Sequence, residues 1–228
     1  MKTWLISDTH VQHWHLTPPK DCEFVIHSGD ESNAHIPYQN ERECRDFIHW
    51  FSQLDIPHKI MIAGNHSAAL EKRLVTKQEL WDLGIHYLEH GYLELEGKKF
   101  FGSPHTPSFG NWYFMKSRET IGRKWEDLEE GIDVLITHGP PKGILDITTD
   151  RYGVTEHVGD NALYKAVQKV KPRFHVFGHI HNGRGHDNDI NSGIFSPGGS
   201  ATTYINASVV EDGQIEMGVI NNGYVIEI

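Results

Sequence analysis

The chain has 228 residues, 38% hydrophobic and 23% charged, which excludes a disordered, collagenous or membrane protein and predicts one domain over 1–228. A formal net charge of −10 argues against an extended nucleic-acid surface, because gripping phosphate backbones needs many lysine and arginine contacts. The N-terminal apolar run is too short for a signal peptide or a membrane span, so we expect a cytoplasmic protein with no membrane association.

Five short apolar runs alternate with amphipathic stretches and are predicted to form buried strands. These runs lie at 4–7, 24–27, 60–63, 134–137 and 176–178. Alternating strands and helices predict an α/β fold with a largely parallel sheet in the first two-thirds of the chain.

The stretches between the runs predict helices. One is marked by apolar residues three and four positions apart within 44–54. A second follows Thr76, whose spacing to Glu79 fits a capping box, and it ends at Gly84. A third is predicted over 161–170, where one face is apolar.

The last third of the chain is predicted to be antiparallel. Strand-like runs lie at 203–209, 215–220 and 224–228, separated by the turn-forming pairs Asp212-Gly213 and Asn222-Gly223. Pairs of this kind are typical of two-residue β-hairpin turns.

Residues that commonly bind metals follow each of the five predicted strands. In chain order they are Asp8 and His10, Asp30, Asn65 and His66, His138, and His179 and His181. The carboxyl ends of neighbouring strands in α/β folds converge on one crevice. We therefore expect these side chains to meet although they are far apart in sequence.

The donor types suggest which metals would bind. Carboxylate, amide and imidazole groups without thiolate suit Mn²⁺, Fe or Zn²⁺ better than Ca²⁺ or an iron–sulfur cluster. Seven ligands are too many for one tetrahedral ion, but two ions bridged by Asp30 can each take four. The sequence therefore predicts a dinuclear metal site.

The motifs DTH, GD, GNH, THGPP and GHIH, in this order, resemble the signature of calcineurin-like metallophosphoesterases. The longer strings GSPHTPSFGNWYF, LITHGPPKGILD and TTYINAS are similar to one branch, the metallophosphoesterase-domain-containing proteins of vertebrate brain and their microbial relatives. The resemblance runs from about Leu5 to Ser208. It implies a four-layer sandwich of two mixed β-sheets flanked by helices.

The resemblance also implies a role for each site residue. One metal would be held by Asp8, His10, Asp30 and His181, and the other by Asp30, Asn65, His138 and His179. His66 would be the catalytic histidine that binds no metal. Two positions depart from the family pattern, because Ser67 follows the GNH motif where an acidic residue is common and Asn33 stands where some relatives have an aspartate that orients the histidine.

Two further places carry candidate substrate contacts. His105, Asn111 and Trp112 lie in a loop rich in aromatic and turn residues, where contact with substrate and simple packing are both plausible readings. Position 105 is histidine where this branch is expected to have an aromatic residue. His157 either faces the crevice or precedes and caps the helix predicted after Asp160.

The implied function is hydrolysis of small phosphodiesters, such as 2′,3′- or 3′,5′-cyclic AMP, by a hydroxide that bridges two metal ions. A phosphomonoesterase or protein phosphatase is the first alternative, because it uses the same metal chemistry. A repair nuclease is disfavoured by the acidic charge and the lack of a capping domain. A non-catalytic scaffold of the same fold is the alternative from another class, and the intact set of ligand positions argues against it.

Overall fold

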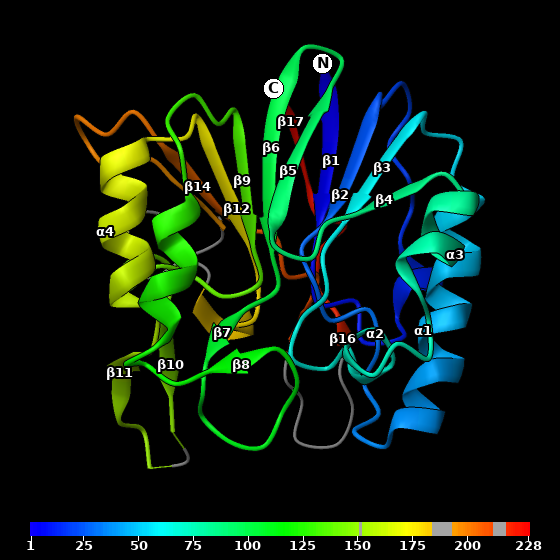
Figure 1. The fold of residues 1–228 in the computed structure, drawn as a ribbon, viewed down its shortest axis with the longest axis horizontal. Coiled ribbons are helices and arrows are strands. Elements are labelled where there is room, and N and C mark those ends of the chain that lie inside the picture. The colour runs from blue at the N-terminus through cyan, green and yellow to red at the C-terminus, as the bar shows by residue number, and fades with distance from the viewer. Residues whose placement is uncertain (151, 184–192, 212–217) are drawn as a thin grey trace.

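The computed structural model describes residues 1–150, 152–183, 193–211 and 218–228. Their strands form two large sheets that face each other in the middle of the molecule, and helices cover the two outer sides (Figure 1). Each sheet contains both parallel and antiparallel pairs. The predicted four-layer α/β sandwich of two mixed sheets is therefore confirmed.

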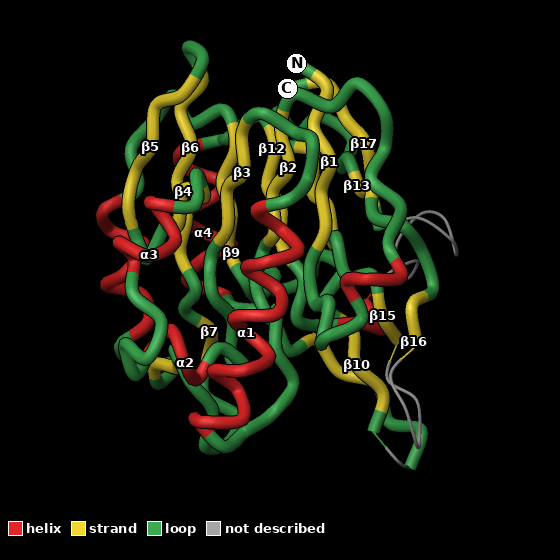
Figure 2. Tube along the Cα trace, turned by 90° about the vertical axis from the view of Figure 1, so that its right-hand side faces the viewer, coloured by secondary structure: helices red, strands yellow, loops and turns green. Residues whose placement is uncertain are grey.

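The first sheet has the strand order β17-β1-β2-β3-β4. In this order its strands span Tyr224–Glu227, Lys2–Ile6, Phe24–His27, His58–Met61 and Ile85–Tyr87. Strands β1 to β4 are parallel, and β17 pairs antiparallel with β1. Figure 2 shows both chain termini at the same end of this sheet, where the Met1 amino group donates to the Ile228 carbonyl oxygen at 3.0 Å.

The second sheet has the strand order β13-β14-β12-β9-β6-β5. Its strands span Ile194–Phe195, Thr203–Asn206, Phe174–Phe177, Val134–Thr137, Lys98–Ser103 and Gly91–Leu95. The four inner strands are parallel, and the two edge strands pair antiparallel with their neighbours. Its parallel strands therefore share one carboxyl edge.

Three two-stranded ribbons lie beyond the large sheets in the lower half of Figure 1. They pair β7 (Thr106–Pro107) with β8 (Met115–Lys116), β10 (Ile147–Thr149) with β11 (Thr155–His157), and β15 (Val210–Glu211) with β16 (Gly218–Val219). These ribbons extend the loops that follow the carboxyl ends of the main strands.

The helices lie on opposite sides of the sandwich. They are α1 (Pro37–Ser52), α2 (Ala68–Glu71), α3 (Lys77–Asp82), α4 (Asn161–Val170) and the 3₁₀ turns η1 (His13–His15), η2 (Ile121–Asp127) and η3 (His181–Gly183). Figure 1 shows α1 and α3 beside the first sheet and α4 beside the second. Helix α3 begins with the predicted capping box, in which Thr76 and Glu79 satisfy each other's backbone N–H groups. Asp160 caps α4 by accepting from the Ala162 N–H.

The layers are held together by three apolar clusters that follow from the alternation of side chains along each strand. On β1, Trp4 packs toward α1 while its neighbour Leu5 faces the second sheet. On β9, Val134 faces the first sheet and Leu135 packs toward α4. Each main strand is thus covered on both faces, which explains why these runs are continuously apolar.

The antiparallel arrangement predicted for the C-terminal third is confirmed in part. Antiparallel pairs join β13 to β14, β15 to β16 and β17 to β1, but β14 also lies parallel to β12. The hairpin predicted at Asn222-Gly223 is wrong, because β16 pairs with β15 while β17 pairs with β1. The structural gain is that β17 covers the edge of β1, whose backbone groups would otherwise be exposed. The Asp212-Gly213 turn falls outside the described residues.

Strands β4, β5 and β6 of the two large sheets are among those that were not predicted from the sequence. Strand β4 is only three residues long, and β5 with β6 forms a hairpin through Glu96 and Gly97. Both turn residues have positive φ, 51° and 72°, as type I′ turns require. Glutamate is an unusual residue for that conformation, so the sequence of this turn only weakly indicates a hairpin.

Within the described ranges, each helix is too short or too polar to cross a bilayer.

Acid is expected to destabilise the fold through buried histidines such as His175 on β12. Burial lowers the pKa of His175 to about 3, whereas an unfolded histidine titrates at roughly 6.5. Between these values the unfolded chain binds more protons, so stability falls as the pH falls. We expect this residue alone to remove ~2 kcal/mol of the free energy of unfolding between pH 7 and pH 5.

Urea denaturation of the chelated protein at several pH values measures this loss. His175→Gln should show a shallower dependence of stability on pH than the unchanged protein, whatever its stability at pH 7. His49→Gln is the matched control, because His49 is exposed on α1. Equal slopes for His175→Gln and the unchanged protein would contradict the expectation.

Candidate metal centre

The seven predicted ligand residues lie in loops that follow five parallel strands of the two sheets. Asp8 and His10 follow β1, Asp30 follows β2, Asn65 follows β3, His138 follows β9, and His179 and His181 follow β12. A backbone bridge between Ser7 and Ser208 joins the two sheets at this edge. The carboxyl ends of both sheets thus converge, as the α/β pattern predicts.

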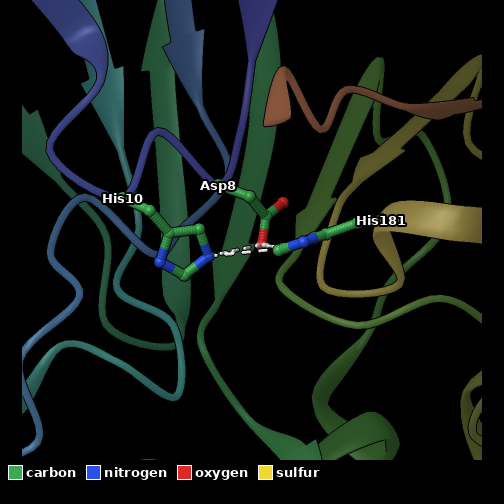
Figure 3. Close-up of side chains that lie close together, drawn as sticks. All are labelled: Asp8, His10 and His181. Atoms are coloured by element: carbon green, nitrogen blue, oxygen red, sulfur yellow. Dashed lines mark hydrogen bonds and ion pairs between the residues drawn. The ribbon is translucent and has the colours of Figure 1, made fainter. Parts of the chain in front are cut away.

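The first group consists of Asp8, His10 and His181 (Figure 3). His181 Nε2 lies 3.3 Å from Asp8 Oδ1 and 3.3 Å from His10 Nε2. The other carboxylate oxygen, Asp8 Oδ2, accepts from Ser208 Oγ at 2.7 Å and from the His179 N–H at 3.0 Å. These two bonds fix the carboxylate so that Oδ1 faces the two imidazoles.

The second group contains Asp30, Asn65, His138 and His179. His138 Nε2 lies 3.1 Å from Asp30 Oδ2 and 2.9 Å from Asn65 Oδ1. Donor atoms of Asp30, His138 and His179 lie within 4.8 Å of one another. The ring centroids of His138 and His179 are 4.9 Å apart.

Asp30 lies between the two groups. Its Oδ2 atom is 3.1 Å from His138 Nε2 in one group and 3.9 Å from His10 Nε2 in the other. Its Oδ1 atom accepts from the His66 backbone N–H at 2.7 Å. One carboxylate oxygen therefore faces both groups, which is the position that a bridging ligand needs.

The histidine rings are held with Nε2 toward the site. His10 Nδ1 lies 3.0 Å from the Ser32 carbonyl oxygen, and His138 Nδ1 lies 3.0 Å from the Ser28 carbonyl oxygen. A carbonyl oxygen only accepts, so each Nδ1 carries a hydrogen and each Nε2 faces the site. An Nε2 atom next to carboxylate oxygens needs a positive charge, from a proton or a metal ion, to avoid repulsion between lone pairs. The residues therefore fit a cation.

The pKa values of the histidines also agree with a site that binds a cation. Burial lowers the pKa of His10 to about 4 and that of His179 to about 3, so both rings are neutral at pH 7, the form in which imidazole can bind a metal. Burial also opposes charge on His138, but the carboxylates of Asp30 and Asp8 outweigh it and raise its pKa to about 9. The field at His138 Nε2 thus favours a positive charge, which a metal ion supplies as well as a proton does.

The backbone of the site is unusual. Asp8, His10, Asp30 and His179 adopt left-handed φ values of 51°, 40°, 58° and 68°. The glycine of GHIH, Gly178, is packed so closely that a β-carbon there would collide with the Asp8 carboxylate. The loops therefore need both strained residues and a glycine to bring the ligands together.

His66 lies beside the first group rather than within it. Its Nδ1 lies 3.0 Å from the Asn33 carbonyl oxygen, and its ring packs on Trp112 with centroids 4.3 Å apart. Its ring is 4.8 Å from that of His10, so its donor atoms also fall close to Asp30. A backbone carbonyl and an indole ring thus orient His66, in place of the aspartate that some relatives use.

The hydrogen bonds of Ser67 explain why a serine can follow the GNH motif. Its hydroxyl donates to Glu31 at 2.6 Å and accepts from the Gly64 N–H at 2.8 Å. Glu31 is completely buried, and burial raises its pKa. A buried acid from the loop after β2 thus faces the GNH turn, where relatives commonly have an acid within the motif itself.

The two groups open into a pocket of about 630 Å³. Its lining includes His66 and Trp112 but neither His105 nor Asn111. His105 is partly buried, with Nδ1 3.2 Å from the Phe114 carbonyl oxygen, and burial lowers its pKa to about 4. Asn111 is exposed in the same loop. Of the three predicted substrate contacts, only Trp112 reaches the pocket.

Several other residues that line the pocket were not predicted from the sequence. The pocket is also lined by Arg118, Lys142, Thr148, Glu156, His157 and Val158, among others. Only His157 had been weighed as facing the crevice. The others lie on a ribbon and on loops whose position depends on long-range packing, so no local pattern marks them.

Comparison with known sequences gives consistent matches. Residues 1–183 match the family model described as Calcineurin-like phosphoesterase. Metallophosphoesterase domain-containing protein 1 of Homo sapiens is 32% identical over 228 residues, covering 90% of this chain and 64% of that protein. A UPF0046 protein of Caenorhabditis elegans is 30% identical over 226 residues, covering 93% of this chain and 71% of the relative. The chain thus spans less than two-thirds of the length of the human relative.

Solved structures share the fold. One superposes with a TM-score of 0.64 at 16% identity and covers 91% of this chain and 90% of that chain. Phosphopantetheinyl hydrolase from Mycobacterium tuberculosis superposes with a TM-score of 0.55 at 12% identity, covering 91% and 89%. The family model matches most of the chain and agrees with the sequence relatives. The chain therefore belongs to the calcineurin-like phosphoesterase family, which points to a metal-dependent phosphoester hydrolase.

Proposed function

We propose that the protein hydrolyses small phosphodiesters, with cyclic nucleotides as the substrate class, at a dinuclear metal centre. The observation that carries this proposal is the position of Asp30 Oδ2 between two groups of inward-facing ligand atoms. The family generally binds divalent metals, and the donor chemistry of the site agrees with Mn²⁺, Fe or Zn²⁺.

Each group would hold one ion. Asp8, His10, Asp30 and His181 form the first set, and Asp30, Asn65, His138 and His179 form the second. Ions bound there would neutralise charge on phosphate oxygens and lower the pKa of water. The carbonyl oxygens of Ser32 and Ser28 keep His10 and His138 in the tautomer that this role requires.

His66 would donate a proton to the leaving oxygen of the substrate. It lines the pocket beside Asp30, and the Asn33 carbonyl accepts from Nδ1, so Nε2 is directed away from that contact. Trp112 covers one face of the ring and limits its rotation. A proton donor held in this way acts without any covalent enzyme intermediate.

The size of the pocket supports an ester with an organic group rather than phosphate alone. Its volume of about 630 Å³ extends from Asp30 to the β10–β11 ribbon. Phosphomonoester hydrolysis remains the alternative reaction, because the same ligand set serves it. The scaffold alternative is disfavoured because all seven ligand positions are present and adjacent.

We place the protein in a reducing compartment such as the cytoplasm. Cys22 and Cys44 are both buried and unpaired, which agrees with an environment that keeps thiols reduced. Burial raises the pKa of both thiols, so neither is poised as a nucleophile.

Parallel assays of bis(4-nitrophenyl) phosphate and 4-nitrophenyl phosphate with added Mn²⁺ test the proposal. The expected result is turnover of the diester that is lost after chelation and restored by metal. Turnover of the monoester alone would move the assignment to a phosphatase. No turnover of either ester, or of 2′,3′- and 3′,5′-cyclic AMP, with Mn²⁺, Fe²⁺ or Zn²⁺ would favour the scaffold.

A further inference from the structure

Part of the pocket lining is formed by the β10–β11 ribbon. Thr148 lies on β10, and Glu156 and His157 lie on β11. These three side chains carry a hydroxyl, a carboxylate and an imidazole. None of the three belongs to a proposed ligand set or is the proposed proton donor.

His157 is fixed by a buried carboxylate. Its Nδ1 lies 2.6 Å from Oδ1 of Asp146, which is completely buried, whereas the His157 side chain is 46% exposed. The second oxygen of Asp146 accepts from the N–H groups of Gly143 and Gly159, each at 2.9 Å. Both oxygens of Asp146 face donors, and the His157 ring is the donor that faces Oδ1, so Nδ1 of His157 carries the hydrogen of this contact.

The opposite ring nitrogen is therefore available for a ligand. His157 Nε2 has no hydrogen-bond partner among the residues that the structure describes, and the residue lines the pocket. The helix-capping role that the sequence left open belongs to Asp160, which accepts from the Ala162 N–H and from Trp125 Nε1. His157 is thus free of a structural role at the helix.

The loop that carries His157 is held rigidly. The Arg118 guanidinium donates to the carbonyl oxygens of Val158 at 2.8 Å and Gly159 at 3.1 Å. A β-carbon at Gly159 would lie 2.7 Å from the Pro141 carbonyl group and 2.8 Å from Asp146 Oδ2, so the loop packs directly on these atoms. A polar group fixed in this way discriminates between ligands better than a mobile one.

We infer that His157 is a specificity-determining residue that hydrogen-bonds a hydroxyl of a ribose-type sugar attached to the phosphate, with Asp146 as its positioning residue. Thr148 and Glu156 on the same ribbon add oxygen atoms suited to a polyhydroxylated group. This inference rests on the proposed function, because the phosphate of the same substrate would lie at the metal centre.

Titration calorimetry with Mn²⁺ present tests the inference, using inorganic phosphate and ribose 5-phosphate as probes. His157→Ala should weaken binding of ribose 5-phosphate by about 5- to 30-fold, the usual effect of losing one hydrogen bond at a polar site. Its affinity for inorganic phosphate should change by no more than about twofold. Asp146→Asn should act in the same direction, and His157→Gln should restore part of the loss.

His49→Ala is the control, because His49 is exposed on α1 and does not line the pocket. Equal losses for both probes in His157→Ala, or no loss for ribose 5-phosphate, would overturn the inference. The binding readout needs no turnover, so binding without hydrolysis would remove the proposed function while leaving the His157 result intact. An unchanged protein that binds ribose 5-phosphate no more tightly than inorganic phosphate would also overturn the inference.

Discussion

Replacing Asp30 by asparagine is expected to remove both activity and metal. The Oδ2 atom faces His138 in one ligand group and His10 in the other, so losing its charge weakens both sets at once. An amide keeps the shape of the side chain but is a poor bridging ligand. We expect kcat for a diester to fall by at least about 10³-fold, since metal ions contribute several kcal/mol of charge stabilisation.

Metal analysis of the purified variant gives the second readout. We expect bound metal to fall from two ions per chain to one or fewer. Asp82→Asn is the matched control, because Asp82 is exposed on α3, and it should retain full metal content and activity. An Asp30→Asn variant with unchanged metal and unchanged kcat would show that Asp30 does not bridge.

Replacing His66 by alanine is expected to slow the reaction without removing metal. His66 lies in the pocket but outside the two proposed ligand sets, and it hydrogen-bonds Asp30 through its backbone N–H. Loss of a positioned proton donor typically costs about 10²- to 10⁴-fold in rate. The loss should be smallest for esters with good leaving groups, because these depart without protonation.

A series of diesters with leaving groups of increasing basicity measures this role. The rate of His66→Ala should fall more steeply with leaving-group basicity than the rate of the unchanged protein. A uniform loss across the series, together with loss of metal, would instead make His66 a ligand. That result would agree with its closeness to His10 and Asp30.

Local sequence signals were sufficient for several elements. Helix α4 spans Asn161–Val170, the range predicted from its apolar face, because Asp160 and the apolar stripe act within the helix itself. The capping box at Thr76 is equally local. The closeness of the candidate metal ligands also followed from the sequence, because each was placed at a strand end and parallel strands bring such ends together.

Other features depended on contacts that no local pattern contains. The parallel pairing of β14 arises from its neighbour β12 rather than from its own residues. The group that orients His66 is the carbonyl of Asn33, and a backbone carbonyl looks the same for every residue type. Glu31 compensates for the serine at position 67 from another loop. Such exchanges between distant segments become visible only in three dimensions.

The left-handed backbone at Asp8, His10, Asp30 and His179 sets a conflict between robustness and activity. Each such residue costs on the order of 1 kcal/mol of backbone strain relative to glycine. Glycine would relieve that strain but would remove the side chains that we propose to bind metal, together with the hydrogen bonds that Asp8 and Asp30 accept. Backbone strain at these four positions is therefore retained together with the side chains that carry the proposed chemistry.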